Sequence, residues 1–298
     1  MDNITYIILL KNQSKNIESL AESLRQIQGN FRKEYIIVDD FSSDNTMEEV
    51  QKHFASFSRA TFVVNDEYHG PSYSINKALS LAHGKYIHFV DGDEILAPES
   101  TLLLYEAIKN FGTNAAFGLS GAIDKKGNKF KSSYETGDTI VLDDPVKNIL
   151  ENNVHDIRKF GFSGSMASTY LLEEMGGLDE HVFTHNISLA LNVAKNSKFA
   201  YVKKTLCFSR EEILARYSKK FEIHDSLLSI VNFMEDHAMY VGHYTPELYK
   251  ALWSLLWNSD KKHKVKSLPR FFLSRYMKRN LDVESLIELY KGYIEGFL

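Results

Sequence analysis

Two acidic residues separated by one glycine, Asp91 and Asp93, directly follow the apolar run at 85–90. Such a run predicts a buried strand, so both carboxylates would leave its end together, with no bulky side chain between them. Carboxylate oxygens suit Mg²⁺ and Mn²⁺, and magnesium commonly takes one or two of them beside water and substrate phosphates. Asp91, Gly92 and Asp93 therefore predict a site for a metal and a diphosphate. The alternative is a solvated acidic turn in which Asp93 or Glu94 caps the next helix.

Short apolar runs alternate with amphipathic helical patterns in the first half of the chain. The predicted strands cover residues 4–10, 35–38, 61–64 and 85–90. This alternation predicts an α/β fold with a mostly parallel sheet covered on both faces. From about residue 114 the pattern loosens into a mixed half-sheet with a hairpin turn at 125–128. Later segments read as helices near 186–196, 221–237, 246–257, 269–279 and 282–295.

A second acidic pair, Asp39 and Asp40, ends the predicted strand at 35–38. Ligands of parallel α/β sheets bind outside the carboxyl ends of the strands, so both acidic pairs would border one crevice. A carboxylate there could accept a hydrogen bond from a base N–H, whereas Asp44 is expected to cap its own helix. The sequence therefore predicts a nucleotide site at this edge.

These motifs, in their order and spacing, resemble glycosyltransferase family 2 over roughly residues 4–210. The matching segments are the first strand with Asn12, and 38–46, 70–79 and 84–93. The resemblance implies a GT-A fold, which is a Rossmann-like mixed sheet flanked by helices. We expect a catalytic domain at 1–215 and a helical C-terminal extension at 216–298. The implied activity is transfer of a sugar from a nucleoside-diphosphate sugar, with UDP favoured, to a saccharide or lipid-linked acceptor, with inversion.

The resemblance also implies roles for single residues. Mn²⁺ or Mg²⁺ would be held chiefly by Asp93, with Asp91, and Asp40 would contact the nucleobase. The loop that begins at Leu10 would lie beside the base and ribose. The expected nucleotide-sugar contacts are Leu10, Asn12, Asp39, Asp40, Asn76, Asp91 and Gly92.

The acceptor side departs from the family pattern. The segment 176–180 matches, but His185 and Asn186 stand where the family has Glu-Asp, whose Asp is the general base. Asn186 has no titratable group, whereas a histidine can serve as a base near neutral pH. We therefore expect His185 or Asp179 to be catalytic, with Glu180 as a further candidate. The alternative for His185 is packing or capping of the following helix. Ile75 and Asn76 also replace the family's Arg-Asn pair.

Two other functions compete with transfer. A chain that kept the donor site but lost the base at Asn186 would be a non-catalytic nucleotide-sugar-binding or assembly module. A nucleotidyltransferase of related architecture would need a glycine-rich N-terminal loop, and residues 10–14 contain no glycine. Neither GxGxxG nor GxxxxGK[ST] follows a strand, which excludes dehydrogenase and P-loop interpretations.

Composition limits the binding partners and the cellular compartment that we expect for the protein. The 298 residues carry a net charge of -4 and one cysteine, Cys207, so neither a nucleic-acid footprint nor a disulfide framework is expected. No apolar run approaches the roughly 18 residues of a membrane span, and we expect a cytoplasmic protein. Basic and apolar residues alternate at 261–279. That segment predicts peripheral contact with the inner face of the membrane, or else a solvated face packed on the catalytic domain or a second subunit.

Overall fold

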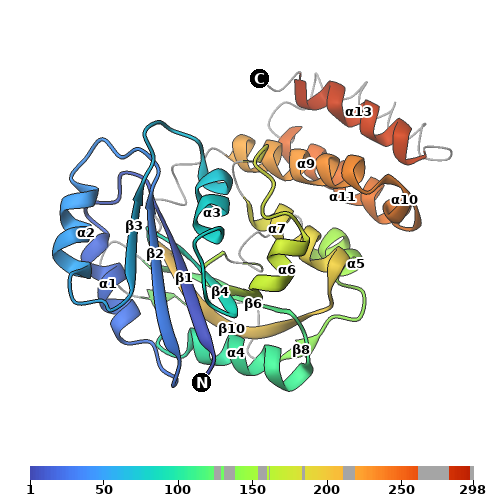
Figure 1. The fold of residues 1–298 in the computed structure, drawn as a ribbon. Helices are drawn as coiled ribbons and strands as arrows, with labels where there is room; N and C mark the ends of the chain where they lie inside the picture. Colours follow the sequence, from blue (N-terminus) through green and yellow to red (C-terminus); the bar gives the residue numbers. More distant parts are fainter. Residues whose placement is uncertain are drawn as a thin grey trace.

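The computed structural model describes residues 1–123, 129–130, 138–153, 160, 162–182, 185–210, 219–260 and 282–295. Its described strands form one twisted sheet with helices on both faces (Figure 1). The strand order is β3-β2-β1-β4-β9-β6-β10-β5, with β7 beside β6 and β8 beside β10. The strands are β1 (Asn3–Leu10), β2 (Arg32–Asp39), β3 (Ala60–Val64), β4 (Tyr86–Asp91), β5 (Glu94–Leu96), β6 (Ala115–Ile123), β7 (Lys129–Phe130), β8 (Ile140–Val141), β9 (Ser165–Ser168) and β10 (Phe199–Arg210).

Helices cover the sheet in two layers, one on each face, and a further group of helices comes after the last strand in the sequence. One layer holds α1 (Ile17–Arg25), α2 (Thr46–Phe54) and α4 (Ser100–Phe111). The other holds α3 (Pro71–Leu79), α5 (Pro145–Asn148), the π-helical turn η1 (Ile149–Asn153), α6 (Thr169–Glu174) and α7 (His185–Asn196). The C-terminal group contains α9 (Lys219–Asp236), α10 (Ala238–Val241), the 3-10 turn η3 (Gly242–Tyr244), α11 (Thr245–Asp260) and α13 (Val283–Glu295).

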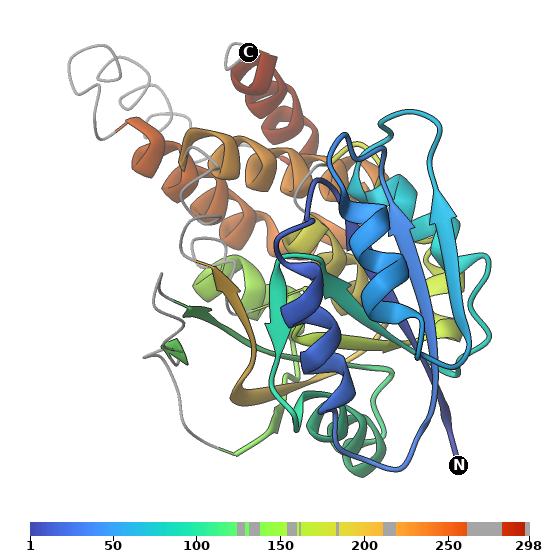
Figure 2. The same ribbon diagram turned by 90° about the vertical axis from the view of Figure 1, so that its left-hand side faces the viewer.

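The alternation of side chains along β1 explains the two layers. Successive residues of a strand point to opposite faces of the sheet. Tyr6 and Ile8 accordingly belong to the core under α1, α2 and α4, whereas Ile7 and Leu9 belong to the core under α3 and α7. All four are buried, as a central strand of a doubly covered sheet requires. Figure 2 views the molecule from the side of α1 and α2.

The predicted parallel half-sheet is confirmed. Strands β2, β1 and β4 pair in parallel, and β3 extends the same half beside β2. The second half is mixed, because β9 pairs antiparallel with both β4 and β6 while β6 and β10 are parallel. β6 and β7 pair antiparallel where a hairpin was expected, although its turn at 125–128 lies outside the described residues.

The C-terminal helices share the core of one sheet face. Buried residues of α9, α11 and α13, such as Leu227, Leu252 and Leu286, belong to the same apolar cluster as Phe89 and Leu191. The proposed domain boundary at 215/216, the helix expected at 269–279 and the basic segment at 261–279 all lie outside the described residues. No helix in the described part of the chain is long and apolar enough to cross a membrane.

Candidate active site at the carboxyl edge of the sheet

Gly92 lets the acidic turn pass close to the end of β1. Its N–H donates to the carbonyl of Leu9 at 2.9 Å. A Cβ at this position would lie 2.5 Å from Leu10 Cδ2 and 2.8 Å from the Leu9 carbonyl oxygen. The sequence suggested that glycine leaves room for a ligand, and the structure adds a different reason, which is close contact with the chain itself.

We predict that Gly92→Ala lowers stability, because the new methyl group must displace backbone as well as the Leu10 side chain. Such overpacking typically costs about 1–3 kcal/mol. The melting temperature, measured by calorimetry, should fall. Gly242→Ala is the matched control, since a Cβ there meets nothing within 4 Å and its φ is -54°. Equal melting temperatures for the Gly92 variant and the parent would contradict the crowding.

Three carboxylates gather beyond β4. Burial, and then the charges of Asp93 and Glu94, hold the pKa of the Asp91 carboxyl well above its usual range. Glu94 is buried, and its Oε1 accepts hydrogen bonds from Ser120 and Ser209. Its Oε2 has no hydrogen-bond partner within the described residues. Repulsion among close carboxylates, together with an unpaired oxygen, is a setting that a cation stabilises.

The residues present fit a metal site that the phosphates of a substrate would complete. No group of three or more His, Cys, Asp or Glu side chains within the described ranges is arranged to hold a metal ion. Asp91 and Asp93 match the one or two carboxylates through which magnesium is commonly bound together with substrate phosphates. Asp93 is partly exposed after the end of β4, at the edge where ligands of such sheets bind.

Asp40 organises the loop that precedes α3. Its carboxylate accepts hydrogen bonds from the backbone N–H groups of His69 at 3.1 Å and Gly70 at 2.9 Å, and from Asn65 Nδ2 at 2.9 Å. Asp40 is 2% exposed. Gly70 has a φ of +91°, which residues with a side chain rarely adopt. In this structure Asp40 therefore shapes the loop 65–70 from beneath, and its carboxylate does not face solvent.

Asp39 is also buried and bonded locally. Its carboxylate accepts from the N–H and the hydroxyl of Ser42, which closes the turn after β2. Asp44 accepts from the N–H of Thr46, the first residue of α2, and so closes the turn that leads into this helix, whose N-cap is Asn45. Both carboxylates fix the turns that follow β2.

The loop after β1 is tied to the loop after β2. Asn12 has a φ of +53°, its N–H donates to Ser42 Oγ, and its Oδ1 accepts from the N–H of Ser43. The side chain of Leu10, which was predicted to contact the nucleotide, is buried in the core. Only its backbone lies near the carboxyl edge of the sheet. Asn12 and Asp39 therefore both bond to Ser42, which joins the loop after β1 to the turn after β2.

Two exposed aromatic rings at this edge, which no sequence motif assigned to the site, lie beside Lys11 of the loop predicted to border the base and ribose. Phe41 is 52% exposed and Tyr68 is 50% exposed. Lys11 Nζ lies 5.6 Å from the centre of the Phe41 ring and 4.4 Å from that of Tyr68. Phe41 lies within the acidic motif, but no signal in the sequence marked Tyr68, because only folding of the loop 65–70 carries it beside Lys11.

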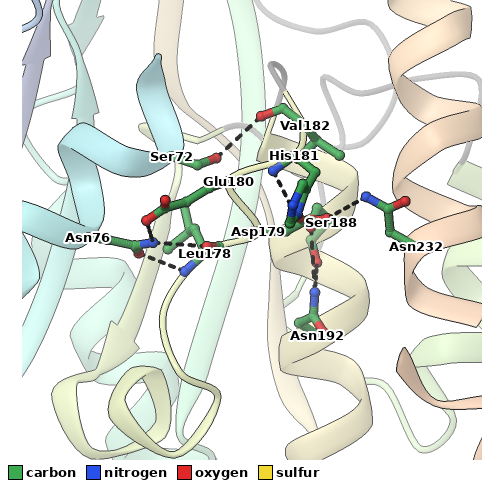
Figure 3. Close-up of polar contacts among 10 residues, drawn as sticks. All are labelled: Ser72, Asn76, Leu178, Asp179, Glu180, His181, Val182, Ser188, Asn192 and Asn232. Atoms are coloured by element: carbon green, nitrogen blue, oxygen red, sulfur yellow. Dashed lines mark hydrogen bonds and ion pairs between the residues drawn. The ribbon is translucent and has the colours of Figure 1, made fainter. Parts of the chain in front are cut away.

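On the acceptor side, Asn76 ties α3 to the segment 178–182 (Figure 3). Its Oδ1 accepts from the Leu178 N–H at 2.8 Å, and its Nδ2 donates to the Leu178 carbonyl and to Glu180 Oε1. Ile75, which occupies the position of the family's arginine, is buried in the core. Asn76 therefore holds the acceptor-side segment against α3.

Asp179 is largely buried, and both of its carboxylate oxygens accept hydrogen bonds. Its Oδ1 accepts from the N–H of His181 at 2.9 Å and contacts His181 Nδ1 at 3.1 Å. Its Oδ2 accepts from Nδ2 of Asn232, on α9, at 3.0 Å. The Asp179 side chain is 13% exposed, whereas that of His181 is 87% exposed. His185 is the first residue of α7, and its side chain lies outside the described part of the structure.

Comparison with known proteins agrees with this architecture. The model of glycosyl transferase family 2 matches residues 5–170, more than half of the chain. The chain therefore belongs to glycosyltransferase family 2, whose members are enzymes that transfer sugars. The mixed sheet and its helical layers are the GT-A fold expected from the sequence.

Named relatives and solved structures are glycosyltransferases. A GalNAc(5)-diNAcBac-PP-undecaprenol beta-1,3-glucosyltransferase of Campylobacter jejuni is 26% identical over 73% of this chain and 70% of its own length. Chondroitin synthase of Escherichia coli is 31% identical over 34% of this chain, which spans 15% of that protein.

Two solved structures share the fold at low sequence identity. S. aureus TarS 1-349 in complex with UDP-GlcNAc has a TM-score of 0.62 at 16% identity, covering 99% of this chain and 92% of that one. The mannosyltransferase PcManGT of Pyrobaculum calidifontis, in complex with GDP-Man and Mn²⁺, has a TM-score of 0.59 at 14% identity, covering 99% and 86%.

Proposed function

We propose that this protein transfers a sugar from a nucleoside-diphosphate sugar, with UDP as the favoured nucleotide, to a saccharide or lipid-linked acceptor. The observation that carries the proposal is the convergence of the acidic turn 91–93 and the loops after β1 and β2 at one edge of a GT-A sheet. Inverting transfer is the stereochemistry expected for the family. The relatives that act on undecaprenol-linked substrates or bind UDP-GlcNAc support the choice of substrates.

The nucleotide would lie on the loops that follow β1, β2 and β3. Phe41 and Tyr68 offer exposed aromatic faces on which a base can stack, and Lys11 holds the two loops together through the carbonyls of Asp40 and Phe41 at 2.8 Å. Asn12 would contact the ribose, and the predicted roles of Asp39 and Asp40 become those of positioning residues beneath the base. Leu10 would contribute through its backbone.

A divalent cation, Mn²⁺ or Mg²⁺, would be held by Asp93 and Asp91 with the diphosphate and would offset the negative charge of the leaving group. Gly92 keeps the two aspartates on a turn pressed against β1. The solved structure of PcManGT with GDP-Man and Mn²⁺, which shares the fold, supports this choice of metal. Location in the cytoplasm, at the inner face of the membrane, remains a prediction.

The test is a thermal-shift screen of UDP, GDP, UDP-GlcNAc, UDP-glucose and GDP-mannose, each with and without Mn²⁺. A ligand that binds only the folded protein must raise its melting temperature. At one hundred times its dissociation constant, such a ligand adds about 2.7 kcal/mol to the free energy of unfolding. We expect the largest increase with one UDP-sugar in the presence of manganese. The proposal fails if neither a nucleoside diphosphate nor a nucleotide sugar shifts the melting temperature under any of these conditions.

A further inference from the structure

The proposed transfer needs a base for the acceptor hydroxyl, and Asn186 cannot supply one. His181 falls outside the positions that the family pattern marks. It lies between the acceptor-side segment and α7, on a stretch of chain that runs along α3 toward Gly70. Leu178 is bonded to Asn76 in the middle of α3, and the carbonyl of Val182 accepts from Ser72 in its first turn at 3.4 Å.

This path leads to the nucleotide loops. Ser72 follows Gly70 by two residues, and the Gly70 N–H is bonded to Asp40. α7 then begins at His185. His181 therefore lies close in sequence to the position of the family's base, on a segment anchored to the first turns of α3.

The ring of His181 is held by one nitrogen and open at the other. Its Nδ1 lies 3.1 Å from Asp179 Oδ1, and its side chain is 87% exposed. Within the described chain no hydrogen bond is made by its Nε2. When the Nδ1–H donates to the carboxylate, the lone pair is on Nε2, which is the tautomer a general base needs. The carboxylate also stabilises the imidazolium once a proton has been accepted.

The carboxylate is itself fixed by the C-terminal helices. Asn232 of α9 donates to Asp179 Oδ2 at 3.0 Å, and the backbone N–H of His181 donates to Oδ1 (Figure 3). The orientation of His181 thus depends on a residue some fifty positions further along the chain, in the extension. Asp179, which the sequence suggested as a base, has its oxygens occupied by these donors.

We propose that His181 is the catalytic base, with Asp179 and Asn232 as positioning residues. This inference rests on the proposed function. The acceptor oxygen forms a bond to the anomeric carbon of the donor sugar, and its proton passes to His181 Nε2. The bond from that carbon to the diphosphate breaks, and its electron pair leaves with the nucleoside diphosphate.

Water can replace the acceptor in the test, so release of UDP from the UDP-sugar selected by the thermal screen is measured with Mn²⁺. We expect His181→Ala to lower kcat by about 100- to 10,000-fold with little change in KM. Asp179→Asn should lower kcat in the parent but add little in the His181→Ala background, because its effect passes through the histidine. A merely structural role of Asp179 would give additive losses.

His83→Ala is the matched control, because His83 is also exposed and paired with a carboxylate, its Nδ1 lying 2.9 Å from Glu34 Oε1. It precedes β4, at the opposite edge of the sheet. Full activity of His181→Ala, or a large loss in His185→Ala alone, would overturn the assignment. A parent that binds the donor yet releases no UDP would also overturn it and favour a binding module. A parent that binds no donor would instead refute the proposed function.

Discussion

Asp93→Ala should abolish the part of nucleotide binding that depends on Mn²⁺ while leaving the fold intact. Asp93 is partly exposed just beyond the end of β4, so its removal creates no cavity in the core. It does remove the carboxylate expected to hold the metal against the diphosphate. Without that charge compensation, sugar transfer should fall by at least about 100-fold, as when other groups that stabilise developing charge are removed. The thermal shift with UDP and Mn²⁺ measures the binding, and UDP release measures the turnover.

Asp91→Ala should have a smaller effect, since the Asp91 carboxylate already accepts a hydrogen bond from the Gly92 N–H at 3.1 Å and Asp93 is the residue expected to hold most of the metal. Asp143→Ala serves as the surface control, because that aspartate is 94% exposed and paired with Lys198. If the Asp93 variant kept the same manganese-dependent shift as the Asp143 variant, the metal assignment would be wrong.

Asp40→Asn should weaken both the fold and nucleotide binding. The carboxylate accepts from two backbone N–H groups and from Asn65, so an amide placed there turns an NH₂ group toward at least one donor. A buried donor left without an acceptor costs about 1–3 kcal/mol. The loop 65–70, which carries Tyr68, should lose its fixed position. We expect a lower melting temperature and a smaller thermal shift with UDP.

Asp66→Asn is the control for this prediction, because Asp66 belongs to the same loop and its side chain is 96% exposed. It should behave like the parent in both measurements. An Asp40→Asn variant with normal stability but reduced UDP binding would favour direct contact with the base over the positioning role.

Local patterns were sufficient to predict the parallel half of the sheet. β1 and β2 are apolar and each is followed by a helix, and the apolar strand β4 follows α3, so period and order alone define them. β5 was missed. This strand has three residues and exists because Glu94 pairs with Ser209, more than a hundred positions away. No local period can report such a partner.

The candidate site, too, was predicted from the sequence only in part. The acidic turns were recognisable because their residues are adjacent in sequence at strand ends. The roles of individual side chains depended on tertiary contacts: Asp40 faces the loop 65–70, and Leu10 packs in the core. His181 gave no signal, since its significance comes from Asp179 and from Asn232 on α9.

A crystal structure with the selected UDP-sugar and Mn²⁺, in which anomalous scattering locates the manganese, would test the proposed metal and nucleotide site directly. We expect a manganese ion bound by Asp93 and the diphosphate at the carboxyl end of β4, with the base beside Phe41 and Tyr68. A nucleotide sugar bound elsewhere on the protein, or a manganese ion that makes no contact with Asp93, would contradict this expectation.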